Sequence, residues 1–267
     1  MTTSTICRND MKRIRSIIKG IAIAAVWIVV WQLCSVFVAD NLEFLLPSPL
    51  VTLRTLFSLA SESDFWLSAA TTLLHVLEGY VLGVLAGIVM GIVTYKVGFL
   101  RDLFNPIRTV IKSTPVTSFI LLVLLWLDTD MVPMFITLLM VLPIVWTAIY
   151  EGLFAVDERL KEMAHVFNVP FAKRLMGIYL PSLRQQLLAA LTTALGLAWK
   201  AGVTAEVIAT PVHSIGAGLY NSKIYLQTPE LFAWTIVVIL LSIVFEKLIV
   251  MGIRMIPLGG KRSGNKI

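Results

Sequence analysis

The sequence predicts an all-α integral membrane protein with about six transmembrane helices and both termini in the cytoplasm. Hydrophobic residues make up 58% of the 267 positions and charged residues only 14%, whereas soluble domains are about 25% charged. A spanning helix needs about 20 mostly apolar residues. The apolar runs of this chain do not alternate with polar residues, as the strands of an outer-membrane barrel do. We therefore expect the chain to cross the membrane as helices.

Six apolar runs are candidates for these spans. The second run is longer than a bilayer requires, so we expect it to tilt or protrude. The third run is interrupted by Pro115. The expected spans are Ile17–Ala39, Phe65–Tyr95, Pro106–Leu127, Met131–Tyr150, Leu183–Ala209 and Leu231–Ile253.

The basic residues indicate the orientation, because Lys and Arg collect in cytoplasmic loops. With the N-terminus inside, 18 of the 22 Lys and Arg residues fall in cytoplasmic segments. The outer segments then hold only two, Arg54 and Lys223. The excess of Lys and Arg in the cytoplasmic segments accounts for the net charge of +6. Membrane lipid is the expected contact of these residues, and no nucleic-acid partner is expected.

The first run is interpreted as a membrane anchor. Its 19 apolar residues from Ile21 to Ala39 exceed a usual signal-peptide core, and Phe37-Val38-Ala39 is a poor cleavage site. Cys7 and Cys34 predict neither a disulfide framework nor a metal site.

Three regions are predicted along the chain. Residues 1–45 form a basic tail and the first span, residues 46–256 form the core, and residues 257–267 form a basic C-terminal tail. The core begins at the helix break Leu46-Pro47-Ser48-Pro49. Apolar residues at helical spacing then predict a short surface helix over about residues 50–60. An ordinary loop is the alternative.

Four glycines recur at intervals of four in the second span, at Gly79, Gly83, Gly87 and Gly91. Small residues on one face of a helix allow a neighbouring helix to approach closely in lipid. We favour packing within the chain, and the wall of a pore is the alternative.

Several ionisable residues fall within the expected spans. His75 and Glu78 share one face of the second span, whereas Lys200 and Glu206 lie on roughly opposite sides of the fifth. Charges within spans usually face the bundle interior or a wet cavity. These residues could form structural ion pairs between helices, and for Glu78 we favour such a pair with Lys200. The alternative is that they contact the solute along its pathway or take part in gating. Trp199 is a further pathway candidate, although packing is the commoner role of tryptophan.

No catalytic or nucleotide-binding motif is present. Gly259-Gly260-Lys261-Arg262-Ser263 lacks the upstream glycine of a phosphate-binding loop, and Arg262 stands where that loop has Ser or Thr. We therefore expect the chain not to be an enzyme and to carry no metal or cofactor of its own.

The most informative segment is the cytoplasmic loop over about residues 151–182. Leu160, Met163, Ala164 and Phe167 recur at helical spacing and predict an amphipathic helix. Asp157 can cap its start. Asn168 stands where a left-handed residue should end it, and a second helix begins near residue 171. This helix has too little apolar surface to be stable alone. We therefore expect it to pack on the chain's own spans, to lie in the headgroup zone of the membrane or to dock in a groove of a partner protein.

This loop resembles the EAA loop of ABC importer permeases, whose pattern is E-A-A-x3-G-x9-I-x-L-P. The chain has Glu162-Met163-Ala164, then Asn168, then Ile178-Tyr179-Leu180-Pro181 at matching spacing. Met163 replaces an alanine of the pattern and Asn168 replaces its glycine.

The resemblance to ABC importer permeases extends over residues 46–253. Within that family, the chain resembles the nitrate/sulfonate/taurine subfamily. The matching stretches are Leu46–Pro49, Gly79-Tyr80 with Gly83 and Gly87, and Ala205-Glu206 followed by Gly216-Ala217-Gly218-Leu219. His75 departs from the subfamily, since many relatives carry Arg there.

The resemblance implies a type I importer permease fold in the bacterial or archaeal cell membrane. It implies partnership with two ABC ATPase subunits, which hold the ATP and Mg²⁺, with a second permease copy as a homodimer, and with an extracytoplasmic substrate-binding protein. The coupling helix that docks on the ATPase would comprise Leu160, Glu162, Met163, Ala164, Phe167 and Asn168. The transported solute is not indicated.

A self-contained secondary transporter is the main alternative. It would couple transport to protons through His75, Glu78 and Glu206, but it leaves the loop from Glu162 to Pro181 unexplained. An intramembrane enzyme is a weaker alternative, because no nucleophile and base are paired in the sequence.

Overall fold

The computed structural model describes residues 18–20, 22–37 and 45–255. The described residues contain helices and no strand, and five of the helices are long and apolar enough to cross a membrane. The expected N- and C-terminal basic tails, Cys7 and the end of the first span lie outside the described residues. The chain divides into two compact units, one of Met1–Glu62 with Asn221–Ile236 and one of Ser63–Tyr220 with Val237–Ile267.

The first unit contains the apolar helix Ile18–Phe37 and α2 (Pro49–Ala60). The Trp31 indole N–H donates to the carbonyl of Pro47 at 3.1 Å, and the Ser35 hydroxyl donates to that of Leu46 at 2.9 Å. Ser48 caps α2, and Pro49 occupies its first turn, where no amide hydrogen is needed. The helix predicted near residues 50–60 is therefore present.

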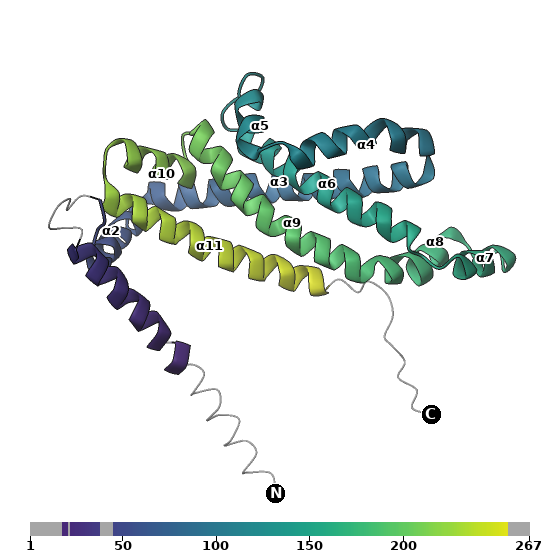
Figure 1. The fold of residues 1–267 in the computed structure, drawn as a ribbon, viewed down its shortest axis with the longest axis horizontal. Helices are drawn as coiled ribbons and strands as arrows, with labels where there is room; N and C mark the ends of the chain where they lie inside the picture. The colour runs from purple at the N-terminus through teal and green to yellow at the C-terminus, as the bar shows by residue number, and fades with distance from the viewer. Residues whose placement is uncertain (1–17, 21, 38–44, 256–267) are drawn as a thin grey trace, which may run out of the picture. The chain divides into compact units, whose positions relative to one another are not determined.

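The second unit is built around α3 (Ser63–Lys96), α6 (Val132–Phe154) and α9 (Leu180–Ala209). Figure 1 shows these long helices side by side. The remaining elements are α4 (Gly98–Ser113), α5 (Val116–Val123), α7 (Glu158–Val166), α8 (Phe171–Arg174) and a π-helical turn (Leu175–Tyr179). Both units include parts of α10 (Ile215–Ile224) and α11 (Thr228–Met255).

The four glycines of α3 form its contact with α6. A Cβ atom built on Gly83 would lie 2.8 Å from Val141 Cβ, and one on Gly87 would lie 2.8 Å from Val145 Cβ. Gly91 likewise faces Ile149. The contacts advance in the same direction along both helices, so α3 and α6 run parallel. The prediction of packing within the chain is confirmed for this glycine face.

The parallel course of α3 and α6 explains the segment between them. Two parallel helices require the chain from Lys96 to Val132 to return to the end from which α3 started. The expected third span, Pro106–Leu127, is interrupted at Pro115 as predicted, but it starts earlier than expected and neither of its two pieces is long enough to be among the five candidate spans of the described residues. The return is made by α4, which begins at Gly98, and by α5, separated at Thr114 and Pro115. Proline lacks the amide hydrogen that would continue the helix.

The core of the second unit joins α3, α6 and α9. Val76, Val145 and Leu195 are among its buried members. Gly202 of α9 lies against Val76, and a Cβ there would stand 2.7 Å from the valine Cγ2. The second unit is thus held by small residues at helix crossings, as expected where lipid removes most of the hydrophobic driving force.

Candidate functional site

The loop that follows α6 contains α7, bounded by two capping arrangements. The Asp157 carboxylate accepts a hydrogen bond from the Arg159 amide at 2.9 Å, which satisfies one free donor of the first turn. Asn168 adopts φ 47°. Its amide bonds to His165 O, and the Val169 amide bonds to Ala164 O, both at 3.0 Å. These bonds form a Schellman motif with asparagine in the glycine position, as the sequence predicts.

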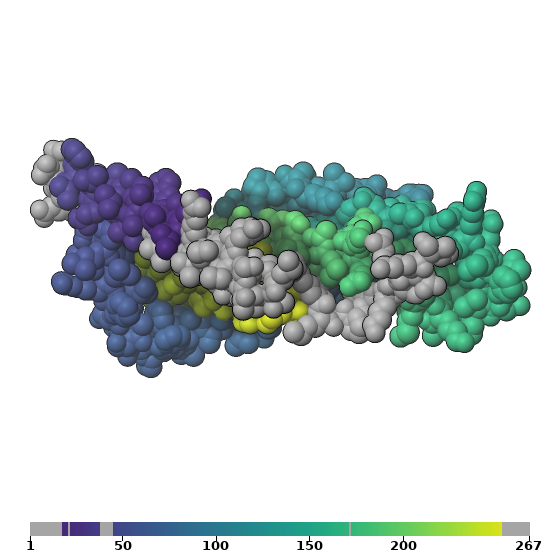
Figure 2. Space-filling view, turned by 90° about the horizontal axis from the view of Figure 1, so that it is seen from below, coloured from purple at the N-terminus to yellow at the C-terminus, as the bar shows by residue number. Residues whose placement is uncertain are grey.

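The apolar stripe of α7 is mostly uncovered. Ala164 is only 1% exposed, but Leu160 is 39% exposed, Met163 48% and Phe167 75%. Glu162 is also exposed. Figure 2 shows the green segment that contains α7 at the surface of one end of the second unit. Packing within the chain therefore covers Ala164 but leaves much of Leu160, Met163 and Phe167 exposed, so it accounts for only part of the stripe.

Lys161 of α7 lies close to the end of α3. Lys161 Nζ lies 2.8 Å from Glu158 Oε1 and 5.9 Å from the centre of the Tyr95 ring. The hydrogen bond that Lys161 donates to Glu158 raises the pKa of Lys161 above its usual value, so the ammonium stays charged. Because Tyr95 belongs to the last turn of α3, Lys161 joins the short helix to the long one.

A second site surrounds Glu206, which is 0% exposed. The Thr72 hydroxyl donates to Glu206 Oε2 at 2.7 Å, and the Gly216 amide donates to the same oxygen at 3.3 Å. His75 Nδ1 lies 3.0 Å from Oε1. The Ile215 amide donates to the Thr72 hydroxyl at 3.0 Å. A buried carboxylate is tolerated where donors surround it, and here the positive end of α10 adds to them.

This cluster explains the Ala205-Glu206 and Gly216–Leu219 stretches that the sequence singles out. A Cβ on Gly216 would collide with Glu206 and lie 2.6 Å from Val207 N. Glycine is needed for the turn that brings α10 back onto α9. Thr72 was missed in the sequence, since a lone threonine on an apolar helix carries no signal of its role.

The expected ion pair between Glu78 and Lys200 was wrong. Both side chains are exposed, and neither forms an ion pair with any residue that the structure describes. Glu206 and His75 form the buried pair instead. Trp199 is 4% exposed and its ring lies 5.6 Å from that of Phe245, so it belongs to the core between α9 and α11. The structure therefore brings together His75 and Glu206, whereas Trp199 packs against Phe245, and within the described residues no ion pair joins Glu78 or Lys200 to this cluster.

The fold and the exposed α7 define a class, that of all-helical, multi-pass membrane proteins with a protruding helical loop. The family model of the binding-protein-dependent transport system inner membrane component matches residues 83–253. The match includes α6, α7 and α9. The chain belongs to this family and is an inner-membrane ABC importer permease.

Relatives cover most of the chain. A Bacillus subtilis protein named as an aliphatic sulfonates transport permease, SsuC, is 25% identical over 82% of this chain and 79% of its own. The Escherichia coli taurine transport system permease protein TauC is 24% identical over 87% of this chain and 86% of its own. A Brucella melitensis protein named as an ABC transporter permease is 26% identical over 76% and 83%.

These names bear on the alternatives. The relatives are named as transport permeases, not as enzymes, in agreement with the expectation for this chain. The family does not favour a self-contained secondary transporter, because its description makes transport depend on a binding protein.

Proposed function

We propose that α7 is the coupling helix of this permease and docks in a groove of an ATPase subunit. The observation that carries the proposal is the exposure of Leu160, Met163 and Phe167 on one face of a doubly capped helix. Large apolar side chains of this kind are anchors of protein interfaces. Glu162, on the exposed side, would add a charged contact at the rim.

The contacts of α7 within the chain support a transmitting role. Lys161 joins it to the last turn of α3. The short turn at Asn168 leads directly into the continuous helix Ala172–Ala209. A displacement of α7 by the ATPase would thus reach two spans of the core without passing through a flexible linker.

The proposed mechanism is alternating access. Two ATPase subunits bind ATP and Mg²⁺, close on each other and carry two docked α7 helices together. The cavity between two permease copies then opens outward, where a substrate-binding protein delivers the solute. The family description, which names a binding-protein-dependent system, supports this last partner.

Replacement of the most exposed anchor tests docking. We expect Phe167→Ala to weaken ATPase binding by about 2 kcal/mol, or roughly thirtyfold, as for a typical interface anchor. Phe57→Ala is the matched control, because Phe57 is 72% exposed in α2. The measurement is titration of purified permease with the ATPase in nanodiscs. Equal affinity of the two variants would contradict the docking role.

Replacement of Glu162 tests coupling separately from assembly. We expect Glu162→Arg to leave the complex assembled while ATP hydrolysis no longer drives uptake in liposomes. Glu158→Arg is not a suitable control because Glu158 bonds to Lys161. The exposed Arg159→Glu change serves instead. A normal ratio of uptake to hydrolysis in Glu162→Arg would refute the role of this residue.

For the solute we propose a small organic anion of the sulfonate type. Two relatives are named for aliphatic sulfonates and taurine. Lys200 supports the assignment, since it lies within the α9 span, is exposed and has no ion pair among the described residues. Intramembrane charges face a wet cavity or a partner helix, and a cation there would attract an anion.

Uptake by the reconstituted importer tests this assignment. We expect Lys200→Gln to slow uptake of taurine or an alkanesulfonate about tenfold and Lys200→Arg to restore most of it. Lys223→Gln, at an exposed position of α10, should have no effect. Equal uptake by the Lys200 variants and the unaltered importer would remove Lys200 from the pathway.

A further inference from the structure

A cavity of about 420 Å³ lies where the end of α3 faces the start of α9. Its volume falls within the range of about 300–1,000 Å³ in which proteins bind small ligands. The wall combines α3 residues such as Ile88 and Ile92 with α9 residues such as Leu183 and Leu187. It is separate from α7's exposed stripe and from the Glu206 cluster.

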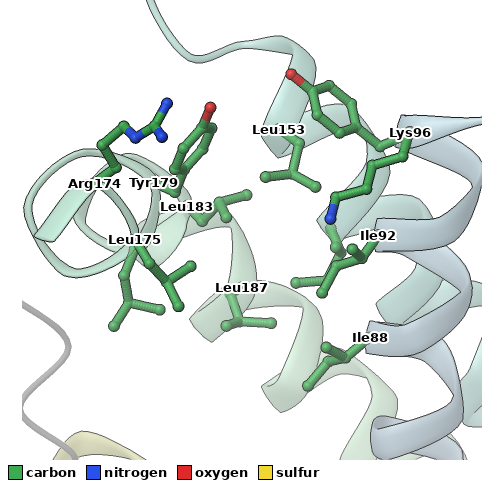
Figure 3. A pocket seen from close by; sticks show the side chains of 12 residues that line it. Ile88, Ile92, Lys96, Leu153, Arg174, Leu175, Tyr179, Leu183 and Leu187 are labelled. Carbon is green, nitrogen blue, oxygen red and sulfur yellow. The ribbon is translucent and has the colours of Figure 1, made fainter. Parts of the chain in front are cut away.

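The cavity is polar at one end and apolar at the other. Lys96 ends α3, and Ile88 lies eight residues before it, about 12 Å along the helix. On the facing wall, Leu187 lies eight residues beyond Tyr179, also about 12 Å. Figure 3 shows Lys96, Arg174 and Tyr179 toward one end, with Ile88 and Leu187 at the other. Such a gradient matches a molecule with a polar head and an apolar chain.

The polar end carries positive charge without a balancing acid. Lys96 and Arg174 are the charged residues among those that line the cavity. Arg174 Nε is buried and has no hydrogen-bond partner among the described residues. A buried donor without a partner destabilises the protein. An anionic acceptor at this end would satisfy the guanidinium, which is well suited to phosphate.

We propose that this cavity binds an anionic phospholipid of the surrounding membrane. Its phosphate lies between Lys96 and Arg174, and one acyl chain follows Ile92 and Ile88 on α3 and Leu183 and Leu187 on α9. Basic pockets between membrane helices are suited to such head groups. The bound lipid joins the end of α3 to the helix that leads from α7 into α9. This binding does not depend on docking of the ATPase.

Lipid retention by the purified permease–ATPase complex tests the proposal. The probes are phosphatidylglycerol and phosphatidylcholine with identical acyl chains, detected by native mass spectrometry. We expect the complex to retain phosphatidylglycerol in preference. Lys96→Gln and Arg174→Gln should each lower its retention about fivefold, the usual effect of one basic residue. Lys173→Gln is the matched control, because Lys173 is the exposed neighbour of Arg174 and does not line the cavity.

A variant in which a larger side chain fills the cavity gives an independent test of lipid binding. Leu187→Trp should reduce retention of the lipid while the complex remains monodisperse. A photoreactive residue at position 92 should cross-link to lipid. Cross-linking to a second permease copy or to residues 256–267 would overturn the proposal. So would equal retention of phosphatidylglycerol by the Lys96→Gln, Arg174→Gln double variant and the Lys173→Gln control.

Discussion

Glu206 shows how one buried carboxylate can organise the end of a membrane helix bundle. It is fully buried and its two oxygens are bonded by Thr72, Gly216 and His75. In lipid, such groups cannot find water as a substitute. The cluster therefore holds α3, α9 and the first turn of α10 in one arrangement, whether or not it also has a part in gating.

Loss of this carboxylate should be costly. We expect Glu206→Leu to lower the free energy of unfolding by about 3–5 kcal/mol, as when one partner of a buried pair is removed. Glu78→Leu, at an exposed position on the neighbouring span, is the control and should change it little. The measurement is the thermal midpoint of the detergent-solubilised permease. Similar midpoints for both variants would show that the cluster does not stabilise the fold.

The glycine opposite Glu206 is a second residue-level test. Gly216→Ala should destabilise the permease by about 1–3 kcal/mol, because the added methyl group overpacks the turn. In contrast, a Cβ on Gly196 of α9 meets nothing within 4 Å, so Gly196→Ala should be neutral or slightly stabilising. Heating followed by size-exclusion chromatography compares the two. An unaltered profile for Gly216→Ala would contradict the close approach.

At the scale of elements, α7 is defined by how it ends. The family pattern has glycine where this chain has Asn168, yet the left-handed conformation is kept. Asparagine tolerates this conformation better than most side chains. The other departure, Met163, is exposed on the proposed docking face and does not disturb the packing of Ala164.

The end of α7 can be strengthened or weakened by one substitution. Asn168→Gly should preserve or slightly increase protection of α7 amides from hydrogen exchange. Asn168→Val should reduce protection severalfold, because left-handed backbone costs a β-branched residue at least about 1–2 kcal/mol. Val166→Gly, which removes an exposed side chain from the last turn, reports the effect of helix propensity alone. Equal protection in the Gly and Val variants at position 168 would refute the Schellman assignment.

The glycine face of α3 packs against α6, and this contact sets the relative direction of the two helices. Four glycines at intervals of four predict a close helix neighbour, but not which helix it is. The structure assigns α6 and shows that the two run parallel. The return of the chain through α4 and α5 then follows from connectivity alone, and Pro115 explains why it is made in two pieces.

At the scale of the whole molecule, sidedness remains a prediction from the basic residues. Single cysteines test it in a background with Cys7→Ser and Cys34→Ser. We expect the exposed Asp130→Cys variant to react with a membrane-impermeant maleimide in intact spheroplasts. The exposed Arg159→Cys variant should react only after permeabilisation, because α7 must face the ATPase. The reverse pattern would invert the topology and exclude the proposed docking.

The membrane class, the short helix over 158–166 and the family of the chain were all predictable from the amino-acid sequence. These features depend on composition, on local capping residues and on spacing within one helix, which do not require knowledge of distant contacts. The asparagine at the end of α7 and the break at Pro115 were predictable for the same reason.

The pairing of buried groups, in contrast, follows from how the helices pack against one another. Glu206 pairs with His75 and Thr72 and not in the expected Glu78–Lys200 arrangement, because partners more than 130 residues apart in sequence are chosen by helix rotation and register. The cavity between Lys96 and Arg174 is of the same kind. It is lined by residues of α3, of α6 and of the helix that leads into α9, and a sequence pattern within any one of these helices carries no information about the space that they enclose.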